Sequence, residues 1–160
     1  MTTVYTIGVY GHSEEGFFNK LVDAQIDTFC DIRMRRGVRG SKYAFVNSKR
    51  LQEKLRSLNI RYFHFKELAP TEAVRNKQKE DDRVQNVHKR SRTRLSQSFI
   101  DAFENEILND FNVEDFVHNI GEEAKNIALF CVEEKPEACH RSVVASYLKK
   151  FLANINVIHL

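Results

Sequence analysis

The chain has 160 residues, of which 42% are hydrophobic and 29% are charged, and its formal net charge is +3. This length fits one domain with a proper hydrophobic core, and we expect residues 1–160 to form it. No apolar run approaches the roughly 20 residues of a membrane span, and no signal peptide opens the chain, so we expect a cytoplasmic protein without a membrane partner. The three cysteines, at positions 30, 131 and 139, do not make a disulfide framework.

Strand-like and helix-like segments alternate in the first part of the chain. Residues 4–9, 28–32 and 60–65 are apolar and β-prone, and they predict three strands. Ser13 is a favourable N-cap for a helix after the first strand, and Asn47 or Ser48 is expected to cap a helix before the third. The predicted buried positions of these two helices are Phe17, Phe18, Leu21, Val22, Leu51, Leu55 and Leu58.

The rest of the chain predicts further helices and two more strands. Residues 71–94 are charged and have weak apolar spacing, which predicts an exposed helix, and residues 96–108 predict a buried one. Residues 127–132 predict a fully buried strand, a helix begins at His140, and residues 157–160 predict a final short strand. Strands separated by helices pair in parallel through right-handed crossovers. The predicted fold is therefore a three-layer α/β domain, with a mostly parallel sheet of about five strands and a helical insertion.

The charged residues are segregated along the chain. Residues 33–61 hold ten basic side chains and one acid, and residues 75–94 hold eight basic side chains and three acids. Residues 101–123 hold eight acids and no lysine or arginine. Segregation on this scale predicts a basic face with an anionic partner, such as DNA or RNA. The alternatives are that these segments neutralise one another across the fold, or that residues 101–123 dock against the helix at 75–94.

Polar side chains follow three of the predicted strands where each strand ends. The carboxyl ends of parallel strands share one edge of the sheet, and ligands bind there in α/β proteins. The residues predicted to carry out catalysis are His12, Asp31, Glu133, Cys139 and His140. The residues predicted to hold an anionic ligand are Arg33, Arg39, Ser41, Tyr43 and Arg141.

Cys139 is placed where a loop meets the N-terminus of a predicted helix. A thiol there, beside a histidine and an arginine, is expected to have a lowered pKa and to act as a nucleophile or to contact a substrate. Tyrosine phosphatases and rhodaneses use such a cysteine, but this loop has no glycine and Arg141 follows too closely. A metal site from Cys139, His140 and Glu133 is not expected, because adjacent residues rarely chelate one ion. No other cofactor is predicted.

Several of these residues also have structural explanations. Asp31 and Arg33 form either a partly buried ion pair or part of a functional site. The ring of Tyr43 either stacks on a base or is buried under the basic loop. Cys30 and Cys131 fall inside apolar, strand-like runs, and we expect them to behave as small core residues.

Short motifs are spread over essentially the whole chain. They are Thr6-Ile7-Gly8 with His12-Ser13, Asp31-Ile32-Arg33, Ile60-Arg61-Tyr62 with Glu67-Leu68, Glu133 to Pro136 before Cys139-His140-Arg141, and His159-Leu160. Together they resemble the family called domain of unknown function 488. The chain departs from the usual pattern by the insertion of residues 9–11 before His12, and by a more basic loop at residues 34–45. The resemblance implies an α/β fold and a candidate site, but no established reaction.

Two classes of function are consistent with the sequence. The first is an enzyme or substrate-binding protein that acts on a phosphate-bearing ligand, such as a nucleotide or nucleic acid, at the strand ends. The second is a non-catalytic nucleic-acid-binding module that uses the basic segments 33–61 and 75–94. We favour the first class, because a module that only tracks phosphates has no need of polar residues gathered at strand ends. The sequence does not predict an oligomeric state.

Overall fold

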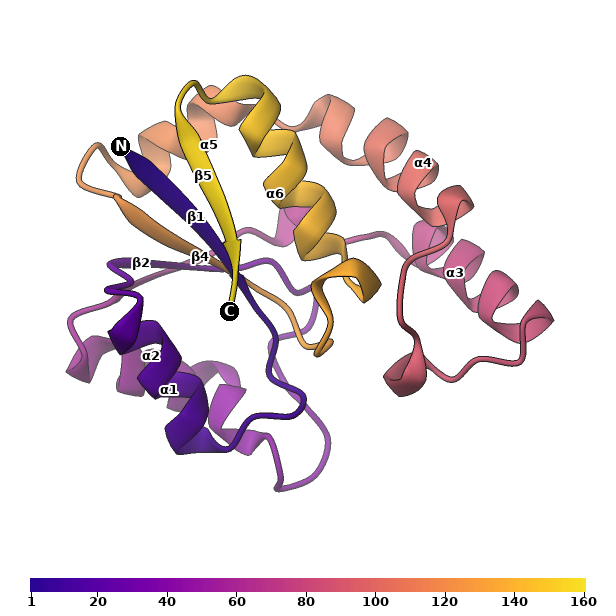
Figure 1. Cartoon of the computed structure of the whole chain (residues 1–160), viewed down its shortest axis with the longest axis horizontal. Helices are drawn as coiled ribbons and strands as arrows, with labels where there is room; N and C mark the ends of the chain where they lie inside the picture. Colours follow the sequence, from indigo (N-terminus) through magenta and orange to yellow (C-terminus); the bar gives the residue numbers. More distant parts are fainter.

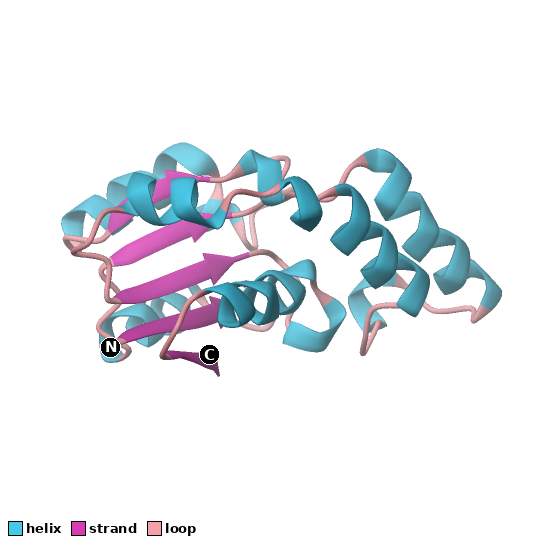
Figure 2. Ribbon diagram, turned by 90° about the horizontal axis from the view of Figure 1, so that it is seen from above, coloured by secondary structure: helices cyan, strands magenta, loops and turns pink.

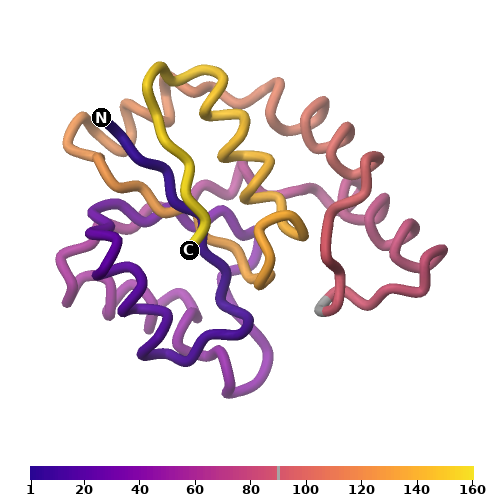
Figure 3. The backbone as a smooth tube through the Cα atoms, viewed as in Figure 1, coloured from indigo at the N-terminus to yellow at the C-terminus, as the bar shows by residue number. Residues whose placement is uncertain are grey.

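Five strands form one parallel sheet in the computed structural model, which describes residues 1–89 and 91–160. In chain order they are β1 (Thr2–Ile7), β2 (Thr28–Asp31), β3 (Arg61–His64), β4 (Asn126–Phe130) and β5 (Ile155–His159). Their spatial order is β3-β2-β4-β1-β5, and every neighbouring pair is parallel. The predicted α/β fold with a parallel central sheet is confirmed, and Figure 3 traces the path of the chain. Arg90, one of the basic residues of segment 75–94, lies outside the described residues.

The central strand, β4, is covered on both of its faces. Ala128 and Phe130 belong to one hydrophobic core, and Ile127 and Leu129 belong to the other. This division follows because successive residues of a strand point to opposite faces of the sheet. A continuous apolar run is therefore what this position in the sheet requires.

Helices cover the sheet on both sides (Figure 1). α1 (Glu14–Asp23) and α2 (Ser48–Ser57) lie on one face, and α5 (Val113–Ile120) and α6 (His140–Phe151) lie on the other. Their buried side chains include Phe17, Leu21, Leu51 and Leu55 in the first layer and Phe116, Ile120, Val144 and Leu148 in the second. Among the described residues, none of the helices combines the length and the apolar character that crossing a bilayer requires.

Some predicted helix positions face solvent instead of the core. Val22 in α1 is 51% exposed, so the buried stripe of this helix is narrower than predicted, and Phe151 at the end of α6 is 60% exposed. The side chain of Ser13 caps α1 as predicted. Asn47 precedes α2 but does not cap it through its side chain, because its Oδ1 accepts a hydrogen bond of 2.7 Å from the amide of Val38. Asn47 therefore holds the basic loop in place.

Two helices of the insertion, α3 (Glu72–Val84) and α4 (Gln97–Glu106), pack against each other. They project beyond the carboxyl ends of the strands (Figure 2), and we call residues 72–106 the helical arm. The prediction of a single helix through residue 94 is wrong, because α3 ends at Val84 and Asn86 adopts a left-handed φ of 52°. Because this stretch of the sequence contains few apolar residues, their spacing does not show where the helices end.

Two further features of the insertion differ from the predictions. Helix α3 is not simply exposed, because Gln78 is buried and its Oε1 accepts a hydrogen bond of 2.8 Å from the amide of Ser96. Helix α5 lies within the acidic segment, where no helix was predicted. Its start is capped by the side chain of Asn112, and Phe116 and Ile120 bury one face of it despite the charged residues between them.

Candidate functional site

A cavity of about 470 Å³ lies between the carboxyl ends of the strands and the helical arm. The strand ends and the start of α6 contribute Arg33, Cys131, Glu133, Cys139 and His140 to its walls. The basic loop contributes Arg39 and Tyr43, and the helical arm contributes Arg75, Lys79, Lys89 and Arg92. A volume of this size suits a small ligand. A larger hollow of about 1050 Å³, on α3, α4 and the start of α6, contains none of the predicted site residues.

Arg33 is fixed in the wall of this cavity by Asp31. The guanidinium donates from Nε to Asp31 Oδ1 at 2.8 Å and from Nη2 to Asp31 Oδ2 at 2.7 Å. It also donates to the backbone oxygen of Val46 at 2.9 Å, and it lies 4.6 Å above the centre of the Phe130 ring. Its Nη1 is buried without a hydrogen-bond partner in the part of the chain that the structure describes. One nitrogen of a guanidinium that Asp31 and Val46 hold through its other nitrogens is therefore left without a partner among the described residues.

Asp31 supports Arg33 and does not itself reach the cavity. Its carboxylate is fully buried, and it also accepts hydrogen bonds from the amide of Arg33 and from the hydroxyl of Tyr62, at 3.2 Å and 2.9 Å. Burial, followed by the charge of Asp31, raises the pKa of Tyr62 to about 12, so this phenol stays a donor. The structure shows the ion pair of the structural interpretation, and Asp31 is not among the described residues that line the cavity.

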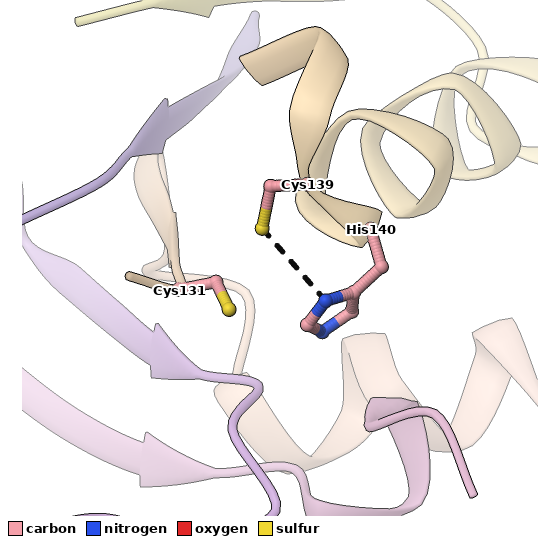
Figure 4. Close-up of side chains that lie close together, drawn as sticks. All are labelled: Cys131, Cys139 and His140. Atoms are coloured by element: carbon pink, nitrogen blue, oxygen red, sulfur yellow. Dashed lines mark hydrogen bonds between the residues drawn. The ribbon is translucent and has the colours of Figure 1, made fainter. Parts of the chain in front are cut away.

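Cys139 and His140 lie together on the floor of the cavity (Figure 4). Cys139 is the N-cap residue of α6, but its side chain makes no capping hydrogen bond. Its Sγ instead lies 3.8 Å from Nδ1 of His140. The other ring nitrogen, Nε2, lies 3.1 Å from the backbone oxygen of Ile32, which can only accept a hydrogen bond. This contact fixes the ring with its Nδ1 toward the thiol.

Cys131 joins this pair from the end of β4, and it is also a buried core residue, as predicted. The ligand atoms of Cys131, Cys139 and His140 all lie within 4.8 Å of one another. The Cys131 thiol also contacts Oε2 of Glu133 at 3.6 Å. All four side chains are buried, and the two cysteines pack into the hydrophobic core on the α6 side of the sheet. Cys30 is likewise a fully buried core residue, as predicted.

The ionisable side chains of this cluster shift one another's pKa values. Burial acts to raise the pKa of Cys139, but the neighbouring Cys131 thiol and the charge of His140 outweigh it and hold that pKa well below its usual value. Contact with Cys139, together with burial, raises the pKa of Cys131. Burial acts to lower the pKa of His140, and the negative charge of Cys139 more than offsets it. Burial, followed by the charge of Cys139, raises the pKa of Glu133.

Arg141 does not reach the cavity, although the sequence predicted a ligand contact for it. It is fully buried and donates to the backbone oxygens of Glu133 and Glu134, at 2.5 Å and 3.0 Å. Its guanidinium thereby holds the turn between β4 and α6. Gly8 permits this arrangement, because a Cβ at this position would overlap the backbone oxygen of Glu133.

Of the four remaining predicted site residues, two line the cavity and two do not. Arg39 lines it, and so does Tyr43, whose hydroxyl accepts a hydrogen bond of 3.1 Å from the amide of Gly11. Ser41 is exposed on the basic loop and does not line the cavity. His12 does not line it either, because its ring packs edge-on against Phe17, at 6.1 Å between ring centres. Burial, followed by the charge of Lys20, lowers the pKa of His12.

Basic side chains dominate the cavity wall. They are Arg33, Arg35, Arg39, Arg75, Lys79, Lys89 and Arg92, and the acids are Asp82 and Glu133. Arg92 is paired with Asp82 at 2.7 Å, and Lys89 lies 3.4 Å from Glu133. Among the described residues, Arg39 and Arg75 form no ion pair. The cavity therefore keeps an excess of positive charge that favours an anionic ligand.

Sequence reasoning missed several residues of this site. Cys131 is the core residue that its apolar strand indicates, but its thiol also lies beside Cys139 and His140, and the second cysteine across the same loop was the signal for this. Lys89 and Arg92 were placed on an exposed helix, and no local pattern shows that the helical arm folds back over the strand ends. Their place in the site depends on contacts that are distant in sequence.

The comparisons with known proteins agree with the motifs along the chain. No curated protein matches it, and no solved structure matches it. The sequence model of one family, described as "Domain of unknown function DUF488", matches residues 13–148. This range includes the loop and helix that carry Cys131, Cys139 and His140, as well as the basic loop after β2. The chain therefore belongs to the DUF488 family.

Proposed function

We propose that this protein is an enzyme that binds a phosphate-bearing ligand, such as a nucleotide or the end of a nucleic acid, in the cavity beside the helical arm. Its reaction takes place at the thiol, imidazole and carboxylate of Cys139, His140 and Glu133. The basic side chains of the wall hold the phosphate, and Arg33 and Arg39 are the principal contacts.

The state of Arg33 carries this proposal. A guanidinium that is only 4% exposed loses most of its hydration, so each of its nitrogens needs a partner. Asp31 and Val46 supply partners for Nε and Nη2, but Nη1 has none among the described residues. A phosphate oxygen in the cavity would satisfy this donor with a charge-assisted hydrogen bond. The reactive side chains lie in the same cavity, within reach of a ligand bound there.

The non-catalytic nucleic-acid-binding module is the second proposal. The basic segment 33–61 supports it, because Arg50 and Arg56 are exposed and lie outside the cavity. A module that tracks phosphates needs such exposed charges, but it does not need buried thiols beside them. The enclosed position of Cys139 and His140 therefore favours the enzyme.

A binding experiment with matched arginine variants tests both proposals. Labelled mononucleotides and short single- and double-stranded DNA and RNA are titrated with the wild type, Arg39→Ala, Arg56→Ala and Cys139→Ser across a salt series. Each variant of arginine removes one positive charge from the segment 33–61, but only Arg39 lines the cavity. We expect Arg39→Ala to weaken binding about tenfold or more, since it removes a charged hydrogen bond, and Arg56→Ala to leave it unchanged.

The other outcomes separate the two functions. Equal losses in both arginine variants, with a steep dependence on salt, would favour the exposed basic face and the binding module. Retained binding in Cys139→Ser together with loss of turnover would place that residue in the reaction. If the wild type binds neither mononucleotides nor polymers at low salt, the proposal of a phosphate-bearing ligand is wrong.

A further inference from the structure

We propose that Cys131, Cys139 and His140 bind one divalent zinc ion on the floor of the cavity, with the fourth coordination position open toward Glu133 and the ligand. Two sulfur ligands and one nitrogen ligand form a donor set that zinc prefers, and three protein ligands with one open position are typical of catalytic zinc sites. The inference names the cofactor of the proposed enzyme, and it rests on the proposed function for the role of the metal in the reaction.

The distances within the cluster are close to those of a zinc site. Zinc binds sulfur at about 2.3 Å and nitrogen at about 2.0–2.1 Å, so tetrahedral geometry separates the sulfur and nitrogen ligands by about 3.6 Å. Cys139 Sγ and His140 Nδ1 lie 3.8 Å apart. The Cys131 sulfur completes a group in which every separation is within 4.8 Å. Small side-chain rotations therefore bring all three ligand atoms around one ion.

The orientation of His140 also suits a metal ligand. Because the backbone oxygen of Ile32 accepts a hydrogen bond from Nε2, the proton of the neutral ring is assigned to that nitrogen. Nδ1 then carries the lone pair and faces the two sulfur atoms. A histidine that binds a metal through one nitrogen usually donates from the other to a carbonyl or carboxylate, and this contact orients the ring.

The fold holds the three ligands on rigid elements. Cys131 directly follows β4, which ends at Phe130, and Cys139 and His140 stand at the start of α6. Arg141 fixes the turn between them through the backbone oxygens of Glu133 and Glu134. Two thiolates balance the charge of a divalent cation, whereas without a cation two thiols, an imidazole and a carboxylate share a buried space at a desolvation cost. A bound zinc ion would offset that desolvation cost through its bonds to the buried ligands.

The sequence argument against a metal site considered only Cys139, His140 and Glu133, and it placed Cys131 in the core. The structure gives a different set of candidate metal ligands, in which Cys131 takes part. Cys131 comes from across the loop and is not adjacent in sequence to Cys139 and His140. At such a site, zinc polarises a substrate oxygen or lowers the pKa of a bound water. The basic residues of the wall would hold the phosphate of the ligand beside the open coordination position.

Cobalt substitution tests the site directly. The full-length protein is treated with a chelator under a reductant that does not bind metals, and it is then titrated with Co²⁺ and afterwards with Zn²⁺. We expect one ion per chain, with visible d–d bands typical of tetrahedral Co²⁺ and a near-ultraviolet thiolate-to-cobalt band that Zn²⁺ abolishes. Cys131→Ser, Cys139→Ser and His140→Ala should each weaken binding by ~100-fold or more, since each removes a direct ligand.

Cys30→Ser is the matched control, because Cys30 is also buried but belongs to the core of β2 and not to the cluster. It should bind Co²⁺ like the wild type. Folding of each variant is checked by circular dichroism, and the wild-type spectrum alone reports thiolate ligation if a variant fails to fold. The absence of a thiolate-to-cobalt band in the wild type, or equal binding by the cluster variants, overturns the metal site.

This outcome is distinguishable from failure of the proposed function. Nucleotide binding is measured on the same chelated protein and on the zinc-loaded protein. Nucleotide binding without metal binding leaves the anion site intact and rejects only the zinc site. Metal binding without binding of any phosphate-bearing probe rejects the proposed ligand and leaves the zinc site in place.

Discussion

Gly8 lies at the point where the backbone after β4 passes closest to the end of β1. In Gly8→Ala, the new Cβ would overlap the backbone oxygen of Glu133 and come within 3.1 Å of Nη1 of Arg141. Backbone cannot move aside easily, so we expect a loss of about 1–3 kcal/mol in the free energy of unfolding, measured by urea denaturation. Gly37→Ala is the control, because its Cβ would meet its nearest neighbour at 3.8 Å. Equal stabilities of the two variants would contradict the close approach at Gly8.

The pair formed by Asp31 and Arg33 shows how burial decides the value of an ion pair. Asp31→Asn leaves the charge of Arg33 buried without its partner, and we expect it to cost about 3–5 kcal/mol of unfolding free energy. Glu14→Gln breaks an ion pair with Arg50 of the same 2.7 Å length, but both side chains are about half exposed. That loss should stay below about 1 kcal/mol. Thermal and urea unfolding of the two variants measure this difference, and similar losses would refute the structural role of Asp31.

At the scale of elements, the turn between β4 and α6 depends on Arg141. Arg141→Lys removes the planar fork that reaches the backbone oxygens of Glu133 and Glu134, and at least one of these acceptors is left without its donor. We expect a loss of about 2 kcal/mol in unfolding free energy. Lys149→Gln, at an exposed position in the last turn of the same helix, should change stability by less than about 0.5 kcal/mol. An unchanged stability of Arg141→Lys would show that the turn does not need this side chain.

The sequence predicted elements well where apolar spacing is strong and poorly where it is weak. The five strands were found, with ends that differ by at most two residues, because each carries a short β-prone run. Helix α6 was found at its correct start, since a clear apolar stripe begins within its first turn, after a polar loop. The arm was misjudged because charged residues dominate α3, and α5 was missed because acids surround Phe116 and Ile120. Local sequence patterns indicate which residues are buried, but they do not indicate which distant part of the chain packs against them.

The candidate site was predictable only in part for the same reason. Parallel pairing placed Arg33, Glu133 and Cys139 at one edge of the sheet, and the structure brings these three to one cavity. The same rule failed for His12, because the added residues 9–11 carry it toward Phe17. It also could not distinguish Arg141, which supports the backbone, from Arg33, which faces the cavity. Side-chain direction depends on packing that the sequence pattern does not record.

At the scale of the whole molecule, few ion pairs of the described residues join the basic and acidic segments, although α4, which carries the first acids of segment 101–123, packs against α3. Within the described residues, one ion pair joins the segments 33–61 and 101–123, between Arg61 and Glu123. The segment 75–94 forms its described ion pairs with acids of its own, such as Asp82, and with Glu133. Neutralisation between the segments therefore accounts for little of the pattern. Most of the positive charge of segment 33–61 is not paired with acids of segment 101–123 within the described residues.

The cavity is built from two parts of the molecule, so a ligand should tie them together. Arg39 belongs to the basic loop and Arg75 to the helical arm, and both line the same space. We expect saturating nucleotide to slow amide hydrogen exchange in residues 72–106 and in the basic loop, and to leave exchange in α1 unchanged. Mass spectrometry of peptides measures this effect, and Arg39→Ala should need about tenfold more nucleotide for the same protection. Protection spread evenly over the molecule would indicate general stabilisation instead.

The position of β4 has a consequence for how the chain assembles during its synthesis. β1 and β2 are made first, but they are not neighbours, because β4 lies between them. A ribosome must therefore release more than three quarters of the chain before the two halves of the sheet can be joined. Until then β1 has no partner strand, and its exposed edge is open to chaperones or to other nascent chains. The residues that complete the sheet also begin the turn with Cys131 and Cys139, so the molecule gains its central strand and its candidate site in the same late step.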